Sequence, residues 1–223
     1  MVALCFASFC RSRSEDEAVG PIVHIVDDDK SFRIAVGRLL EASGFRVISY
    51  ESGDDILTRL TGSEPGCILL DLQMPGLSGS ELQGRLAQKA PLLPIVFLTG
   101  QAEIEDSVRA MKAGAEDFLE KHASNKALLG AIERALLQYE KRRTQQDHVH
   151  SLHALVAALT PREYQVFDRI VRGKRNKQIA YDLSTSERTV KAHRHSVMEK
   201  LGVGSLAEAV SIAERLGLVD PAA

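Results

Sequence analysis

Five short apolar runs, each separated from the next by a segment of helical periodicity, constrain the fold of this chain more than any other feature. They occupy residues 22–26, 45–50, 67–70, 95–98 and 115–119, and Gly, Pro or Asp bounds them. Residues 32–42 and 104–113 repeat apolar side chains at helical spacing and stop before Gly44 and Gly114, which are typical helix ends. This repetition predicts a parallel sheet with helices on both faces.

Polar side chains follow four of these runs, where the predicted strands end. Residues 27–29, all Asp, follow the first run, Asp71 the third, Thr99 the fourth and Lys121 the fifth. The carboxyl ends of parallel strands share one edge of a sheet, where open α/β folds bind ligands. Phosphoryl transfer to a carboxylate needs an ionised nucleophile, a divalent cation and donors for the developing charge. The pattern predicts Asp71 as phospho-acceptor, assisted by Thr99 and Lys121, with Mg²⁺ between Asp71 and the acidic run.

Each of these residues also fits a simpler structural role when it is taken alone. An acidic run is usually a solvated turn, and a single Asp after a strand is usually a cap. Thr99 could merely end a strand, and Lys121 could be a solvated loop charge. Their joint order along the five runs favours the functional interpretation.

This ordered set, with DLQMPGLSG after the third run, resembles the receiver domain of two-component response regulators over residues 21–140. The resemblance implies a flavodoxin-like α/β fold whose five-stranded parallel sheet has the order 2-1-3-4-5. It also implies that Asp28 binds Mg²⁺ directly, Asp27 through water and Gln73 through its backbone carbonyl. Phe118, three residues before the lysine, matches the aromatic switch residue whose burial reports phosphorylation in that family.

One departure from the receiver pattern lies beside the lysine. His122 follows Lys121 where receivers normally carry proline, and residues 123–125 lack the usual aromatic side chain. Receivers ordinarily hold a cis peptide bond here, but for a non-proline residue the cis form costs about 2.5 to 4 kcal/mol. We therefore predict a trans bond between Lys121 and His122.

The chain divides by composition into a receiver domain at 21–138, a polar helical linker at 139–154 and a helical domain at 155–223. Residues 1–20 are expected to form a frayed extension. Residues 21–121 hold 10 Lys and Arg against 16 Asp and Glu, whereas residues 160–205 hold 10 against 5. The acidic part therefore suits a cation and the basic part a polyanion.

The second domain is predicted to be all-α, with a helix, a tight turn and a further helix. Pro161 stands in the first turn of its first helix, and Gly173 ends that helix. Ser186 is the predicted N-cap of the third helix. A capping box that pairs Ser184 with Glu187 is the alternative, and it would start the helix two residues earlier.

The motifs NKQIA, at 176–180, and SERTVKAHR, at 186–194, resemble the LuxR-type helix-turn-helix, and with the receiver they are similar to the FixJ branch of that family. Lys191, Ala192 and His195 of the third helix are expected to face DNA bases in the major groove. The other predicted DNA-binding residues, mostly for phosphates, are Lys174, Asn176, Lys177, Ser186, Arg188, Thr189 and Arg194. The simpler interpretation is a solvated basic helix face.

Together these features predict a cytoplasmic DNA-binding response regulator. Its expected partners are a sensor histidine kinase, double-stranded DNA and a second copy of the chain after phosphorylation, with RNA polymerase a further candidate. No membrane association is expected, because no apolar stretch approaches the roughly 20 residues of a membrane span. The odd number of cysteines, 3, favours a reducing compartment over a disulfide framework.

Two alternatives keep part of this pattern. One is a receiver-like protein that no longer accepts phosphate and acts as a constitutive DNA-binding or interaction module. The other is a phosphatase that forms an aspartyl-phosphate, but such enzymes carry a second Asp two residues after the nucleophile, where this chain has Gln73. We therefore expect no enzymatic activity beyond the chain's own phosphorylation and dephosphorylation.

Overall fold

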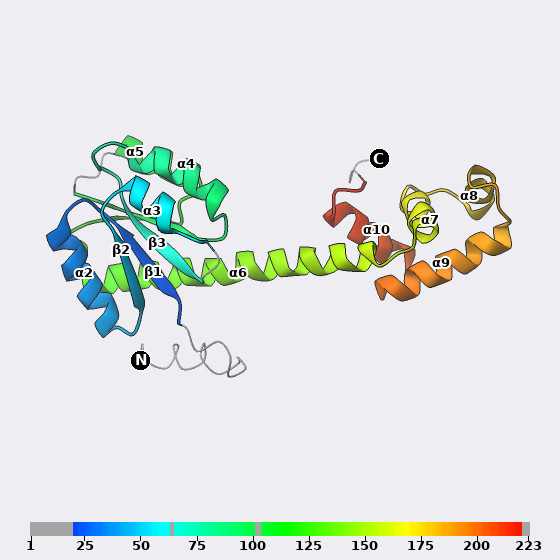
Figure 1. The fold of residues 1–223 in the computed structure, drawn as a ribbon, viewed down its shortest axis with the longest axis horizontal. Coiled ribbons are helices and arrows are strands. Elements are labelled where there is room, and N and C mark those ends of the chain that lie inside the picture. The colour runs from blue at the N-terminus through cyan, green and yellow to red at the C-terminus, as the bar shows by residue number, and fades with distance from the viewer. Residues whose placement is uncertain (1–19, 63–64, 101–103, 220–223) are drawn as a thin grey trace. The chain divides into compact units, whose positions relative to one another are not determined.

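The computed structural model describes residues 20–62, 65–100 and 104–219 (Figure 1). The predicted extension at 1–20 lies almost wholly outside the described residues. The chain forms two compact units that divide between residues 142 and 143, and each is described separately below. Helix α6 (Asn125–Ala157) runs through this division, and the predicted linker at 139–154 lies within it.

The first unit is built on a parallel sheet of five strands in the order β2-β1-β3-β4-β5, which confirms the predicted topology. The strands are β1 (Ile22–Val26), β2 (Arg46–Tyr50), β3 (Gly66–Asp71), β4 (Ile95–Thr99) and β5 (Asp117–Glu120). β5 begins two residues later than predicted. The reason is that the Ala115 N–H donates to the Ala110 carbonyl and closes the end of the preceding helix.

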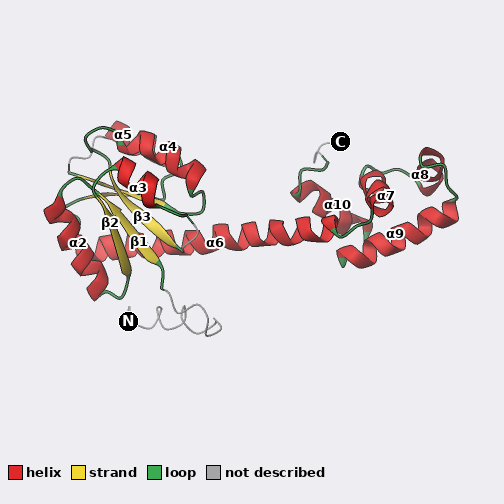
Figure 2. Cartoon of the chain, in the orientation of Figure 1, coloured by secondary structure: helices red, strands yellow, loops and turns green. Residues whose placement is uncertain are grey.

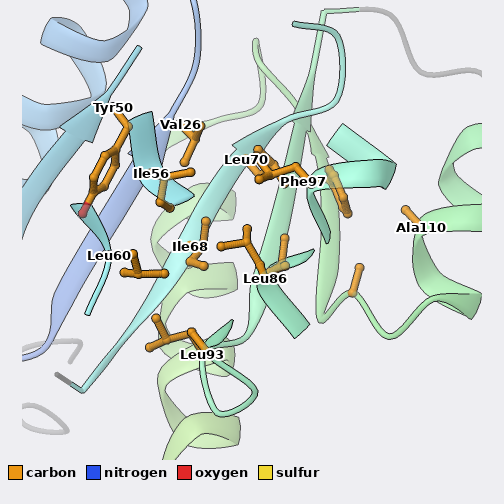
Figure 3. Close-up of a cluster of buried hydrophobic side chains, with 14 of the residues drawn as sticks. Val26, Tyr50, Ile56, Leu60, Ile68, Leu70, Leu86, Leu93, Phe97 and Ala110 are labelled. Carbon is orange, nitrogen blue, oxygen red and sulfur yellow. The ribbon is translucent and has the colours of Figure 1, made fainter. Parts of the chain in front are cut away.

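Helices cover both faces of this sheet. Besides α6 they are α2 (Lys30–Ala42), α3 (Gly53–Arg59), α4 (Gly79–Lys89) and α5 (Ile104–Lys112). On one face Ile68 and Leu70 of β3 pack with Ile56 of α3 and Leu86 of α4 (Figure 3). On the other face Val23, Ile25, Cys67 and Leu69 pack with Leu40 of α2 and Ile132 of α6. Strand residues alternate between two apolar layers, so both faces of the sheet are buried.

The regular elements among the described residues of the second unit are all helices, joined by short turns and loops (Figure 2). It contains the end of α6 followed by α7 (Pro161–Val171), α8 (Asn176–Asp182), α9 (Glu187–Leu201) and α10 (Leu206–Arg215). Its core is apolar and includes Phe167, Ile179, Val190 and Val197. These helices confirm the predicted all-α domain.

The start of α9 decides between the two predicted caps. The Ser186 hydroxyl accepts a hydrogen bond from the Thr189 N–H at 3.1 Å, so Ser186 is the N-cap. Ser184 lies in the turn with φ of 50°, a left-handed conformation outside the helix. The alternative start at Ser184 is therefore wrong.

Candidate functional site

Three carboxylates meet at the carboxyl edge of the sheet, as the sequence predicts. Asp27 follows β1 and Asp71 ends β3, and the pairing of Val26 with Leu70 brings these two strand ends together. Asp27 and Asp71 are only 1% and 3% exposed, whereas Asp28 is exposed. One oxygen from each of the three carboxylates lies within 4.8 Å of the others.

Lys121 joins two of these carboxylates. Its Nζ lies 2.7 Å from Asp27 Oδ2 and 2.8 Å from Asp71 Oδ2. Its backbone N–H donates to the Thr99 carbonyl at 2.7 Å, which ties the loop after β5 to the end of β4. The Lys121–His122 peptide bond is trans, as predicted. The structure thus brings Asp27, Asp71 and Lys121 together.

Backbone N–H groups orient the second oxygen of each buried carboxylate. The Gln73 N–H donates to Asp71 Oδ1 at 3.1 Å, and the Asp29 N–H donates to Asp27 Oδ1 at 2.8 Å. In both side chains one oxygen is held by the backbone and the other contacts Lys121. This arrangement leaves the carboxylates little rotational freedom.

Burial and pairing shift the pKa values of Asp71 and Lys121. Burial raises the pKa of Asp71, against the opposing hydrogen bonds from Lys121 and Gln73. Burial alone would lower the pKa of Lys121, but its hydrogen bonds to Asp27 and Asp71 outweigh burial and raise it. Lys121 therefore carries its positive charge at neutral pH, where it neutralises part of the carboxylate charge.

Thr99 and Phe118 occupy the strands beside Asp71. Thr99 is the fully buried last residue of β4, one position beyond Leu98, the cross-strand neighbour of Asp71. Phe118 is half-buried on β5, with its ring centroid 6.4 Å from that of Phe97. Both lie on the strands where the sequence placed them, and their functional roles stay predictions.

The start of α4 lies close to the end of β3, the strand that ends in Asp71. The Gly79 N–H donates to the Leu72 carbonyl at 3.1 Å. A Cβ at Gly79 would lie 2.8 Å from the carbonyl oxygen of Asp71 and 2.9 Å from the Cα of Leu72. Because both neighbours are backbone atoms, this approach requires glycine.

The donor set suits a hard divalent cation. Three carboxylates supply oxygen ligands of the kind that Mg²⁺ and Ca²⁺ take in proteins, and two are buried. Asp27, Asp28 and Asp71 would hold the ion, in competition with the Lys121 ammonium. Gln73 orients Asp71 through its N–H, and ligation through its carbonyl stays a prediction.

The exposed face of α9 carries the residues predicted to contact DNA bases. Lys191, Ala192 and His195 are all exposed, as is Arg188 near the start of the helix. Thr189 is half-buried, and its hydroxyl lies 2.8 Å from that of Ser186. This face is free within the described part of the second unit to meet a DNA groove.

Several of the predicted phosphate-binding side chains also hold the helices together. Arg194 of α9 donates to Asn176 Oδ1 of α8 at 2.9 Å. Lys174 pairs with Asp182 at 2.6 Å, and both Lys174 and Lys177 are exposed. Arg194 and Lys174 are therefore positioned before any ligand binds.

Sequence reasoning missed two contributors to the carboxylate site. Phe32 begins the run of apolar side chains at helical spacing over residues 32–42, but Lys121 Nζ lies 4.8 Å from the centroid of its ring. Arg33 Nη1 donates to the carbonyl of Asp27. Apolar periodicity contains no signal for either contact, because both depend on how α2 starts.

Among the described residues, no helix is both long and apolar enough to cross a membrane.

Comparison with known proteins identifies the two units. Residues 23–133 match the response regulator receiver domain family, and residues 157–213 match the luxR family of bacterial regulatory proteins. The transcriptional regulatory protein FixJ of Bradyrhizobium diazoefficiens is 38% identical over 89% of this chain and 97% of its own length. The response regulator protein TmoT of Ectopseudomonas mendocina is 37% identical over 87% and 89% of the two chains. The structure of response regulator StyR is 43% identical, with a TM-score of 0.73 over 88% of this chain and all of that one. The chain therefore belongs to the transcriptional response regulators that join a receiver domain to a LuxR-family DNA-binding domain.

Proposed function

We propose that Asp71 accepts a phosphoryl group from a sensor histidine kinase, and that this modification controls DNA binding by the second unit. The observation that carries the proposal is the buried Asp71 carboxylate, held by the Gln73 N–H at one oxygen and by Lys121 at the other. This geometry presents a positioned nucleophile beside a fixed positive charge.

In the proposed transfer, a carboxylate oxygen of Asp71 forms a bond to phosphorus while the bond from phosphorus to the kinase histidine breaks. The departing imidazole nitrogen keeps that electron pair. Lys121 balances negative charge on the phosphoryl oxygens, and the Thr99 hydroxyl donates to one of them. Mg²⁺ held by Asp27, Asp28 and Asp71 would neutralise further phosphoryl charge and reduce repulsion among the carboxylates.

The proposed output is binding of α9 in the major groove of double-stranded DNA. Lys191, Ala192 and His195 would contact base edges, while Lys177 and Arg188 contact phosphates. A single helix-turn-helix offers few base contacts, so pairing of two phosphorylated copies would raise affinity for a two-part site. The protein would act in the cytoplasm, with RNA polymerase as a further partner.

Treatment of the full chain with a small phosphodonor tests the proposal. We expect the intact mass to increase by one phosphoryl group when Mg²⁺ is present, and uptake to slow strongly in EDTA. No increase in either condition would contradict phosphoryl acceptance and favour a receiver that works as a constitutive DNA-binding or interaction module.

A further inference from the structure

The ammonium group of Lys121 has an aromatic neighbour besides its two carboxylates. Its Nζ lies over the Phe32 ring, 4.8 Å from the centroid, within the roughly 6 Å over which a cation is attracted to an aromatic face. The Lys121 side chain is 22% exposed, so this contact is largely withdrawn from water. Partial desolvation strengthens a cation–π contact relative to one on the surface.

The position of the ring is fixed by the acidic segment itself. The Asp29 N–H donates to Asp27 Oδ1 at 2.8 Å, and Asp29 in turn caps α2. Asp29 Oδ1 accepts from the Ser31 N–H at 2.8 Å and from the Phe32 N–H at 3.3 Å. The start of α2, and with it the ring, is therefore built on the same carboxylate that contacts Lys121.

The loop after Lys121 leaves space beside the lysine. A cavity of about 310 Å³ between α2 and the start of α6 is lined by both Phe32 and Lys121. His122 pairs with Glu120 at 2.8 Å, and Ala123 contributes only a methyl group to the cavity wall. The Phe32 ring is thus a packing contact for a lysine that also lines this cavity.

We propose that Phe32 is a positioning residue that holds the Lys121 ammonium in the phospho-acceptor site through its ring face. The carboxylates of Asp27 and Asp71 are also candidate cation ligands, so a bound divalent cation competes with the lysine for their oxygens. The ring cannot ligate that cation, and it therefore remains a partner of Lys121 when a cation occupies the carboxylate oxygens. This inference rests on the proposed phosphoryl acceptance by Asp71.

The test replaces Phe32 in the full chain by 4-fluoro-, 3,5-difluoro- and 3,4,5-trifluorophenylalanine. Fluorine withdraws electron density and so makes the ring face less negative, while it nearly preserves the shape and apolar character of the ring. We measure the rate of phosphorylation by a small phosphodonor with Mg²⁺, and separately the thermal midpoint of the first unit in EDTA. We expect both to fall stepwise, with a total loss of about two- to fivefold in rate.

Two controls separate this role from packing. In a Lys121→Met background, fluorination of Phe32 should change neither the phosphorylation rate nor the thermal midpoint. Methionine keeps most of the apolar chain of the lysine but removes its charge. Fluorination of Phe167, which is buried in the second unit, should also change neither quantity. A flat series in the protein that keeps Lys121, or an equal fall in the Lys121→Met background, would overturn the proposal. If the unmodified protein takes up no phosphoryl group, the proposed function and this inference fail together. The measurement on the unmodified protein comes first, so this outcome is distinguished from a failure of the inference alone.

Discussion

A buried histidine in the middle of β1 should make the first unit sensitive to mild acid. His24 of β1 is 1% exposed, and its Nδ1 lies 3.0 Å from the hydroxyl oxygen of Tyr50. Its Nε2 has no hydrogen-bond partner among the described residues. Burial lowers the pKa of His24 from 6.5 to about 4, because the charged ring would lose its hydration.

The sign and size of the effect follow from this pKa difference. The unfolded chain takes up the proton first as the pH falls below 6.5, while the folded chain resists it until about pH 4. The contribution of neutral His24 to the free energy of unfolding is therefore fully present above pH 6.5, and it is lost as the pH falls from 6.5 to 4. At about 1.4 kcal/mol for each pH unit, the loss approaches roughly 3 kcal/mol.

The perturbation is the double substitution His24→Leu with Tyr50→Phe, which removes the titrating ring together with the tyrosine hydroxyl that contacts it. Urea unfolding of the full chain is measured between pH 7 and 4.5, with β1 amide NMR signals as probes of the first unit. Carboxylate titrations are common to both proteins and largely cancel in the difference.

We expect the unmodified protein to lose about 2 to 3 kcal/mol more than the double variant over this range. His150→Leu, at an exposed position on α6, is the matched control, and its free energy of unfolding should depend on pH as that of the unmodified protein does. If the free energy of unfolding falls equally with pH in the unmodified protein and the double variant, the assignment of acid sensitivity to His24 is refuted.

Two further predictions concern the second unit. Lys191→Ala should relax sequence preference and cost about 1 to 3 kcal/mol at the preferred site, whereas Lys177→Ala should weaken all DNA alike and reduce the salt slope by about one. Anisotropy titrations at several salt concentrations test this, and equal loss of selectivity in both variants would contradict it. Lys200→Met should lower the thermal midpoint of the second unit, since it removes the partner 2.6 Å from Glu163. Hydrogen bonds from Lys200 and Thr160 lower the pKa of Glu163 to about 2, so its stabilisation is present above pH 4.5 and lost toward pH 2. Lys200→Met should therefore lose less stability than the unmodified protein over that pH range, and Lys177→Met is the control. Parallel curves of stability against pH for Lys200→Met and the unmodified protein would contradict the pairing of Lys200 with Glu163.

Much of the fold follows from short-range patterns in the chain. Strand runs such as 67–70 are recognisable because both faces of a parallel sheet are buried, and Asp71 is recognisable because the run ends there. The order of polar residues at strand ends also predicts the carboxylate cluster. These features depend on local sequence and on a topology that strand–helix alternation largely determines.

Other features depend on contacts between elements and leave no local signal. The late start of β5 results from a hydrogen bond that closes α5, and the contact of Phe32 with Lys121 joins residues far apart in the chain. The pairing of Arg194 with Asn176 likewise appears only once α8 and α9 pack. Periodicity reports which side of a helix is buried, but it does not report which neighbour a side chain meets there.

Phosphorylation of three matched proteins tests the central claim most directly. The unmodified chain, Asp71→Asn and Asp54→Asn are each treated with a small phosphodonor and Mg²⁺, and their intact masses are compared. Asp54 is an exposed residue in the first turn of α3, so its substitution controls for the loss of one carboxylate. Circular dichroism checks whether all three proteins remain folded. We predict one added phosphoryl group on the unmodified chain and on Asp54→Asn, and none on Asp71→Asn. A phosphoryl adduct that persists on folded Asp71→Asn would contradict the assignment of Asp71 as the phospho-acceptor.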